Sequence, residues 1–372
     1  MLGWKIWSTK DAISPCHSEL YIHDCPQLVE VSAEALPLLR LLEISFCDHV
    51  VLRSLVQAAS SITMLDIRYI SGLTYEVWSG VMKHIGAIEE VRIHMCNEIR
   101  YLWESEEEAS KVLVNIKKLE VDNCSNLVSL GEKEEEDNFG SSLLSSLRTL
   151  VVISCNKMER CCCPNSIESL RIRRCSSLTH VSFPTSTAGV VGHKLKSLDI
   201  VDCRELMEKI NNISTGVLES IYIRDWADLK SLMQFGNFIY LTQLHLEHCP
   251  SLESFPNIPL PVLTDLTIEE CVRMKSFSAH QMSNLTQLKR LKIRDCPSID
   301  ASSHGELIEV DGHDWAVAVA TLNWVSKEEV GMLAQHLRTE AVKRRNSSKH
   351  NGITKLLKRN LEEELEDMIK ES

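Results

Sequence analysis

The residues best suited to chemistry in this sequence are its 14 cysteines, because a thiolate can act as a nucleophile or bind a metal. The densest cluster is the run Cys161–Cys163. Zinc sites usually take two separated pairs of ligands, whereas this run is one local cluster. The segment Asp311–Asp314, which reads DGHD, places acids beside an imidazole but has the composition of a turn. We therefore predict neither a metal site nor a catalytic site in these clusters.

Motifs for nucleotide or hydrolase chemistry are missing from the sequence. The phosphate-binding pattern Gly-x-x-x-x-Gly-Lys-Ser/Thr does not occur, and the segment Gly189–Lys194, which reads GVVGHK, does not match it. The G-x-S-x-G turn of serine hydrolases is also missing. We therefore predict that the chain is not an enzyme and binds no cofactor.

The cysteines instead belong to a repeated phrase. The segment Leu288–Ile299 reads LKRLKIRDCPSI, and related phrases start at Leu241 and Leu263. The place of the cysteine is called the key position here, and Ile70 and Trp226 occupy it in two further phrases. Between positions 25 and 296 the 12 key positions recur at a mean spacing of about 25 residues. The key position is filled by these ten cysteines: Cys25, Cys47, Cys96, Cys124, Cys155, Cys175, Cys203, Cys249, Cys271 and Cys296.

This period, with the pattern L-x-x-L-x-L-x-x-N/C inside it, is typical of leucine-rich repeats. Leu291 and Ile293 are two residues apart, so both point to one face of a short strand. We expect successive strands to stack in parallel, about 4.8 Å apart. A single repeat cannot bury its own apolar face, so neighbouring repeats must cover each other. The sequence predicts an α/β fold, a curved leucine-rich-repeat solenoid of about 12 irregular repeats with a parallel sheet on its concave face.

The cysteine at the key position has a physical explanation. A thiol is a small, mostly apolar group with a weak hydrogen-bond donor. It can fill a narrow buried column without the cost of burying an unpaired amide. We therefore expect the ten cysteines of this column to be structural.

Three segments follow from the repeat pattern. We expect an N-terminal segment over residues 1–17, the solenoid over residues 18–300, and a helical tail over residues 301–372 that caps the solenoid or is loosely attached. Two acidic stretches, Glu104–Lys111 and Gly131–Ser142, lie inside the longest repeats. Runs of like charge are usually solvated, so we expect both stretches to form surface loops.

Charge and hydropathy suggest the surroundings of the protein. The formal net charge of −12 argues against nucleic acid or an anionic membrane as a partner. The first 15 residues lack the apolar core of a signal peptide, and no stretch reaches the roughly 20 apolar residues of a membrane span. We expect a cytoplasmic protein with reduced thiols.

The side chains between and after each inward-pointing pair should project from the concave face. Arginine and tyrosine are common anchors in protein interfaces. Arg171, Arg173 and Arg174 form a basic step that would suit an acidic partner, and Val151 and Ile153 form a small apolar patch. The alternative, to which we give equal weight, is that an exposed strand face is polar without binding anything. The candidate protein-binding residues are Tyr21, Arg68, Arg92, Arg171, Arg173, Tyr222, Arg224, His245, Lys292 and Arg294.

The repeats resemble the leucine-rich-repeat region of plant nucleotide-binding leucine-rich-repeat disease-resistance proteins. The resemblance rests on the L-x-x-L-x-I-x-x-C-x-x-L units and on their endings, such as Cys249–Leu252, Cys296–Ile299 and Cys124–Leu127. Unit lengths from 20 to 31 residues are also similar to that family, and the resemblance covers about residues 18–300.

The resemblance implies a protein-recognition module. Its partner would be a pathogen effector or a guarded host protein, and also the nucleotide-binding domain if the chain is part of a longer receptor. An alternative is a leucine-rich-repeat substrate receptor of a ubiquitin ligase that lacks its F-box. Only 17 residues precede the first repeat, and the C-x-x-L-T-D-x-G-L phrase of those proteins is missing. A receptor ectodomain would need a signal peptide and L-x-G-x-I-P phrases, and neither is found.

Overall fold

The computed structural model divides the chain into two compact units. One comprises Met1–Asp228 with Gln234–Gly236, and the other comprises Leu229–Met233 with Asn237–Ser372. The expected tail, residues 301–372, lies outside the described residues. The structure describes residues 5–8, 17–32, 35–104, 106–131, 144–164, 166–183, 194–206, 217–230, 232, 238–255, 259–275, 285 and 287–297.

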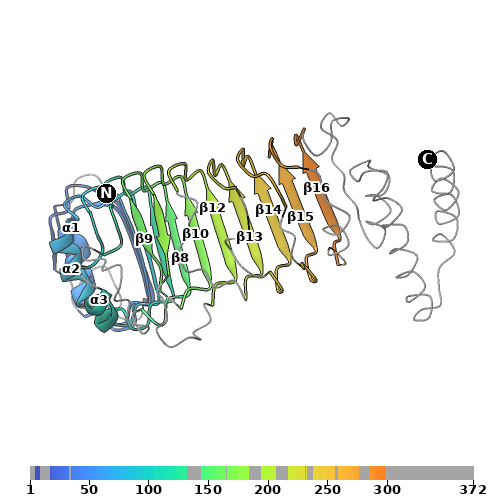
Figure 1. Cartoon of the computed structure of the whole chain (residues 1–372). Helices are drawn as coiled ribbons and strands as arrows, with labels where there is room; N and C mark the ends of the chain where they lie inside the picture. Colours follow the sequence, from blue (N-terminus) through green and yellow to red (C-terminus); the bar gives the residue numbers. More distant parts are fainter. Residues whose placement is uncertain are drawn as a thin grey trace, which may run out of the picture. The chain divides into compact units, whose positions relative to one another are not determined.

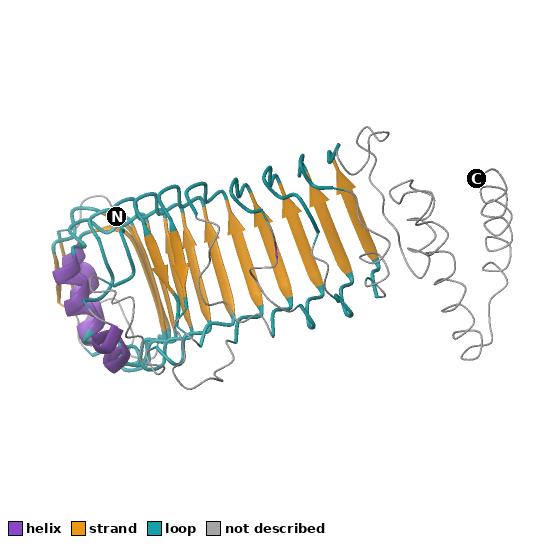
Figure 2. Ribbon diagram, in the orientation of Figure 1, coloured by secondary structure: helices purple, strands orange, loops and turns teal. Residues whose placement is uncertain are grey.

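In the described residues, each expected repeat contributes one strand to a parallel sheet (Figures 1 and 2). The first unit has the strand order β13-β12-β10-β8-β7-β6-β5-β4-β2, and the second unit has the order β16-β15-β14. The prediction of a leucine-rich-repeat solenoid is therefore confirmed. The strands of the first unit are β2 (Glu19–Cys25), β4 (Leu41–Cys47), β5 (Met64–Arg68), β6 (Glu90–His94), β7 (Lys118–Asp122), β8 (Thr149–Ile153), β10 (Ser169–Arg173), β12 (Ser197–Val201) and β13 (Ser220–Arg224). Those of the second unit are β14 (Gln243–Glu247), β15 (Asp265–Glu269) and β16 (Arg290–Arg294).

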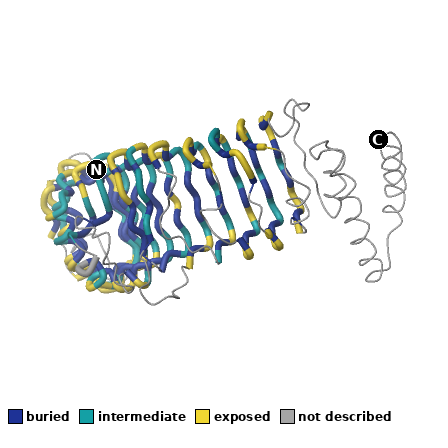
Figure 3. Tube along the Cα trace, viewed as in Figure 1, coloured by how far each residue is buried: buried dark blue, intermediate teal, exposed yellow. Residues whose placement is uncertain are grey.

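The strands pair without offset, so equivalent positions of successive repeats lie side by side. Leu65 on β5 pairs with Val91 on β6, which pairs with Leu119 on β7. On β6 and β7 the second and fourth residues are buried and the others are partly exposed, as a strand with one face on a core requires. The same alternation of dark blue with teal and yellow runs along the strands in Figure 3.

In each of these 12 repeats, the residue directly before the key position is left-handed. Their φ angles lie between 49° and 56°: Asp24, Phe46, Tyr69, Met95, Asn123, Ser154, Arg174, Asp202, Asp225, His248, Glu270 and Asp295. This conformation costs an L-residue other than Gly about 1 kcal/mol, and Asp, Asn and His tolerate it best. Its amide donates across to the next repeat, as Met95 N does to Asp122 O at 2.9 Å. The turn aims the following side chain at the core.

All ten cysteines at the key position are buried and free of disulfides. The Cys124 thiol donates weak hydrogen bonds to the carbonyls of Asp122 at 3.7 Å and of Ile93 at 3.8 Å. Burial raises the pKa of Cys96 to about 11 and that of Cys124 to about 12. Trp226 is also buried at this position, and its indole nitrogen donates to Leu206 O at 3.0 Å. The thiols of Cys96 and Cys124 are therefore protonated near neutral pH.

The described connections of the first unit contain three helices: α1 (His49–Ala58), α2 (Tyr75–Met82) and α3 (Glu106–Val112). Asp48 caps α1, since its Oδ1 accepts a hydrogen bond from Val50 N at 3.0 Å. Helix α3 covers most of the stretch Glu104–Lys111, for which we expected a loop, because Glu, Ala and Lys are good helix formers. Within the described residues, no helix is long and apolar enough to cross a bilayer.

Two pairs of short strands form separate parallel ladders, β1 (Ile6–Ser8) with β3 (Glu30–Ser32) and β9 (Arg160–Cys162) with β11 (His180–Ser182). The run Cys161–Cys163 lies at the second ladder, since Cys161 and Cys162 are part of β9. Cys161 and Cys163 are buried, with their sulfur atoms 3.9 Å apart. In the part of the chain that the structure describes, no group of three or more His, Cys, Asp or Glu side chains is arranged to hold a metal ion.

Candidate functional site

The solvent-facing side of the sheet, called the open face here, carries the candidate residues. It consists of the first, third and fifth residues of each strand, whereas the second and fourth point into the core. The predicted binding residues all come from the columns of third and fifth residues, and the column of first residues was not predicted. Strand alternation alone would have revealed it. The missed column reads Glu19, Leu41, Met64, Glu90, Lys118, Thr149, Ser169, Ser197, Ser220, Gln243, Asp265 and Arg290.

The candidate residues all lie on the open face but differ in exposure. The exposed ones are Tyr21, Arg68, Arg171, Arg224 and Arg294, and the half-buried ones are Arg92, Arg173, Tyr222, His245 and Lys292. The prediction of an exposed apolar patch at Val151 and Ile153 is wrong, because Val151 is only 5% exposed. Val151 pairs with Glu120 on one side and Arg171 on the other, and long side chains at such close spacing cover it.

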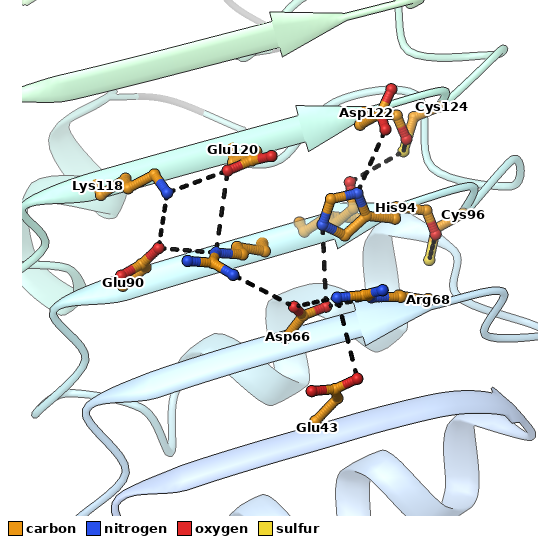
Figure 4. Close-up of polar contacts among 12 residues, drawn as sticks. Glu43, Asp66, Arg68, Glu90, His94, Cys96, Lys118, Glu120, Asp122 and Cys124 are labelled. Atoms are coloured by element: carbon orange, nitrogen blue, oxygen red, sulfur yellow. Dashed lines mark hydrogen bonds and ion pairs between the residues drawn. The ribbon is translucent and has the colours of Figure 1, made fainter. Parts of the chain in front are cut away.

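Strands β4 to β7 carry a connected set of charges, called the charge lattice here (Figure 4). The lattice consists of Glu43, Asp66, Arg68, Glu90, Arg92, His94, Lys118, Glu120 and Asp122. Its centre is Asp66, whose side chain is 2% exposed. The Arg68 guanidinium donates to both carboxylate oxygens of Asp66, at 2.9 and 2.8 Å. This contact raises the pKa of the Arg68 guanidinium above its usual value.

The rest of the charge lattice spreads from Asp66 to the neighbouring strands. Arg92 Nη1 and His94 Nε2 lie 3.8 and 3.9 Å from the Asp66 oxygens. Glu90 accepts hydrogen bonds from Lys118 Nζ at 2.9 Å and from Arg92 Nε at 2.8 Å. Burial acts to raise the pKa of Glu90, but these hydrogen bonds outweigh it and hold that pKa below its usual value. Each cation of the lattice is thus engaged by carboxylates of this chain.

Strands β10, β12 and β13 carry a smaller cluster, in which Arg171 and Arg173, called the arginine pair here, share one acid. Arg171 Nε lies 2.9 Å from Asp199 Oδ2, and Arg173 Nε lies 3.1 Å from Asp199 Oδ1. The Asp199 side chain is 11% exposed. The Arg173 guanidinium also lies over the Tyr222 ring, 5.8 Å from its centroid. Two arginines and one aspartate leave one positive charge in a fixed position.

The predicted basic step is therefore only partly correct. Arg171 and Arg173 come together on the open face, but Asp199 neutralises one of their two charges. Arg174 is the left-handed residue after β10 and leaves the open face for the edge of the sheet. There it lines a shallow hollow with Arg204, whose Nε is held by Asp202 at 3.0 Å.

The remaining candidates also have acidic neighbours within the chain. Tyr21 donates to Glu19 at 2.9 Å, and Arg224 contacts Asp225 at 3.2 Å. In the second unit, the partners are His245 with Glu247 at 3.4 Å, Lys292 with Glu269 at 2.6 Å, and Arg294 with Asp295 at 3.2 Å. These candidates on the open face are thus each held by an acidic side chain of the same chain.

The balance of charge changes along the open face of the first unit. Strands β2 and β4 to β7 present six carboxylates and three Lys or Arg side chains, a net charge of −3 with neutral histidines. Strands β8, β10, β12 and β13 present three arginines and one carboxylate, a net charge of +2. A partner of either charge would therefore prefer one of these two regions.

Two solved structures align with most of this chain at low sequence identity. The leucine-rich-repeat domain of the type III effector XopL aligns with a TM-score of 0.30 and 19% identity, over 78% of this chain and 72% of that chain. Rad7, in a complex with Elc1 from yeast, aligns with a TM-score of 0.30 and 16% identity, over 71% of this chain and 59% of that chain.

One named protein and one protein family match parts of this sequence. A stretch of 121 residues, 32% of this chain, is 31% identical to the Arabidopsis thaliana protein At3g14460, which is named as a disease resistance protein. That stretch spans only 8% of the relative's length. Residues 134–297 match the family described as plant disease resistance protein RPS2-like, leucine-rich repeats. Residues 134–297 are therefore similar to the leucine-rich repeats of plant disease resistance proteins.

Proposed function

We propose that the open face of this protein recognises another protein, either a pathogen effector or a host protein that such an effector alters. Leucine-rich-repeat families are typically protein-interaction modules rather than enzymes. The observation that carries the proposal is the arginine pair, which is held by Asp199 and lies beside Tyr222.

The geometry of this cluster supports a role as a binding anchor. Arginine and tyrosine contribute much of the binding energy in many interfaces. A side chain that is already fixed loses less conformational entropy on binding, and Asp199 fixes both guanidinium groups in advance. The surplus positive charge then favours a partner that presents carboxylates, which arginine binds through two parallel hydrogen bonds.

The acidic half of the open face offers fewer free anchors. Arg68 and Arg92 each contact carboxylates of the charge lattice, so a partner would have to displace existing contacts. We therefore place the main contact for an acidic partner on β10, β12 and β13. We further propose that recognition takes place in the cytoplasm, where the buried thiols stay reduced.

A comparison of variants tests this function. The tagged chain and a variant with Arg171→Ala, Arg173→Ala and Tyr222→Ala are expressed in infected plant leaf tissue, and their co-purifying proteins are compared by mass spectrometry. We expect at least one acidic pathogen or host protein to be recovered with the wild type and lost from the variant. Binding of that purified protein is then measured by calorimetry.

The matched control is Lys275→Ala, which removes an exposed basic side chain of the second unit that lies outside the open face and should retain the partner. Equal recovery of all partners by the wild type and the triple variant would refute the role of this cluster.

A further inference from the structure

Three neighbouring repeats place large apolar side chains at the left-handed position that ends each strand. Phe46, which is the second-last residue of β4, and Tyr69, which directly follows β5, are 47% and 42% exposed. Their rings stack with centroids 4.2 Å apart and an interplanar angle of 16°. Met95 occupies the same position after β6 and is half-buried. Phe46, Tyr69 and Met95 are called the aromatic ridge here.

The aromatic ridge is unfavourable for the folded chain in two ways. Its residues have φ angles of 52°, 51° and 54°, a conformation in which bulky side chains are rare. Half of the 12 equivalent positions hold Asp, Asn or His, which adopt this conformation more readily. The ridge also leaves apolar surface in water, and the stacking of the two rings recovers only part of that loss. Backbone strain that coincides with exposed apolar surface often indicates a binding site.

The surroundings of the ridge indicate the chemistry of its partner. Asp24 occupies the equivalent position in the repeat before Phe46. The adjoining open face of β2 and β4 to β7 carries a net charge of −3. The guanidinium of Arg68, which precedes Tyr69, is bound to Asp66 in a bidentate contact. A cation beside the ridge would therefore meet an excess of carboxylates.

We propose that the aromatic ridge is a docking site for a segment of a partner protein that presents an aromatic or large aliphatic side chain next to lysine or arginine. The apolar side chain packs against the stacked rings of Phe46 and Tyr69. The neighbouring cation faces Asp24 and the acidic strands. This site does not depend on the arginine pair. It favours a basic partner segment, whereas the arginine pair favours an acidic one.

Peptide selection followed by affinity measurement tests the site. A phage-displayed library of random peptides is selected against the full chain, and the enriched peptides are measured by fluorescence anisotropy. We expect an enriched pattern with one aromatic or large aliphatic residue beside Lys or Arg. The double variant Phe46→Asn with Tyr69→Asn should bind these peptides roughly tenfold or more weakly. Because Asn suits the left-handed position, the midpoint of urea unfolding should stay equal or rise.

Two controls separate this site from general effects and from the proposed function. Glu270→Asn makes the same substitution at the equivalent position after β15 and should leave peptide affinity unchanged. The variant with Arg171→Ala and Arg173→Ala should also bind the peptides normally, so that either proposal can fail without the other.

Three results would overturn the proposal. The first is equal peptide affinity in the wild type and the double variant, or an enriched pattern dominated by acidic residues. The second is a clear fall in the unfolding midpoint of the double variant, which would make the ridge a stabilising device. The third is a wild-type dimer in light scattering that the double variant abolishes, which would make a second copy of the chain the occupant.

Discussion

Asp66 on β5 and Asp199 on β12 occupy the same position in their repeats, yet they are surrounded by different numbers of charges. Asp66 is 2% exposed and lies among four further carboxylates and three Lys or Arg side chains of the charge lattice. Asp199 is 11% exposed and holds two arginines. In the first region carboxylates outnumber cations, so each arginine is fully engaged; in the second a positive charge is left over. Whether the charge of an arginine on the open face is neutralised therefore depends on the number of carboxylates around it.

The largest effect should come from the core that both regions share. Burial raises the pKa of Cys124 in the first region and of Cys203 in the second to about 12. Since the thiol pKa in an unfolded chain is about 8.5, this contribution to stability is complete below that pH and is lost as pH rises toward the folded pKa. Each buried thiol should lower the free energy of unfolding by about 1.4 kcal/mol per pH unit in that window.

Urea unfolding followed by circular dichroism between pH 7.5 and 10, with a reductant present, measures this loss. The variants Cys124→Ala and Cys203→Ala should each have a shallower pH dependence than the wild type. A midpoint that stays constant up to pH 10 would contradict the burial of the thiols in both regions.

A smaller effect should distinguish a buried ion pair of the charge lattice from an exposed ion pair elsewhere in the chain. Arg68→Ala removes the bidentate partner of Asp66 and leaves a buried carboxylate with contacts no shorter than 3.8 Å. Loss of one partner of a buried pair typically costs about 3 kcal/mol, whereas an exposed pair such as Arg294 with Asp295 contributes less than about 1 kcal/mol. The free energies of unfolding of Arg68→Ala and Arg294→Ala measure the difference. Equal values would show that Asp66 does not need Arg68.

The smallest effects concern the arginine pair, because either arginine can stabilise Asp199 alone. We expect Arg171→Ala and Arg173→Ala to cost about 1 kcal/mol each, and the double variant to cost more than their sum because Asp199 then has no cation. A double-mutant cycle based on urea unfolding measures this coupling. Additive single effects would indicate that the two arginines do not share the carboxylate.

Much of the fold could be predicted from the sequence because the spacing of apolar residues in each repeat determines which side chains face the core. Leucines two residues apart define an inward-facing strand, and the recurring key position aligns one strand with the next, as Leu65, Val91 and Leu119 show. The acidic stretch that forms α3 was misjudged, because its charge was weighed and its helix propensity was not. The left-handed residues were also missed, since positions filled by Phe46 or Tyr69 give no local signal for that conformation.

The candidate site was less predictable than the fold. Its residues were found in two of three columns, and the missing column supplies Glu90 and Lys118 to the charge lattice. The contact between Arg171 and Asp199 joins residues 28 positions apart, and only the alignment of strands brings them together. Whether an arginine is engaged depends on such neighbours, so composition alone overestimated the basic step.

The recurring left-handed turn has a consequence for how such a protein changes over generations. Each described repeat has the same left-handed bend directly before an inward-pointing residue, whatever the length of the connection that comes next. A connection can therefore gain a helix, as after β4, β5 and β6, without disturbing the alignment of the strands. Unequal crossing-over between genes can add or delete whole repeats in the same way, provided that each new repeat has its own left-handed residue before the key position. Sequence differences can thus accumulate in the loops and on the open face while the buried core and the pairing of the strands stay the same.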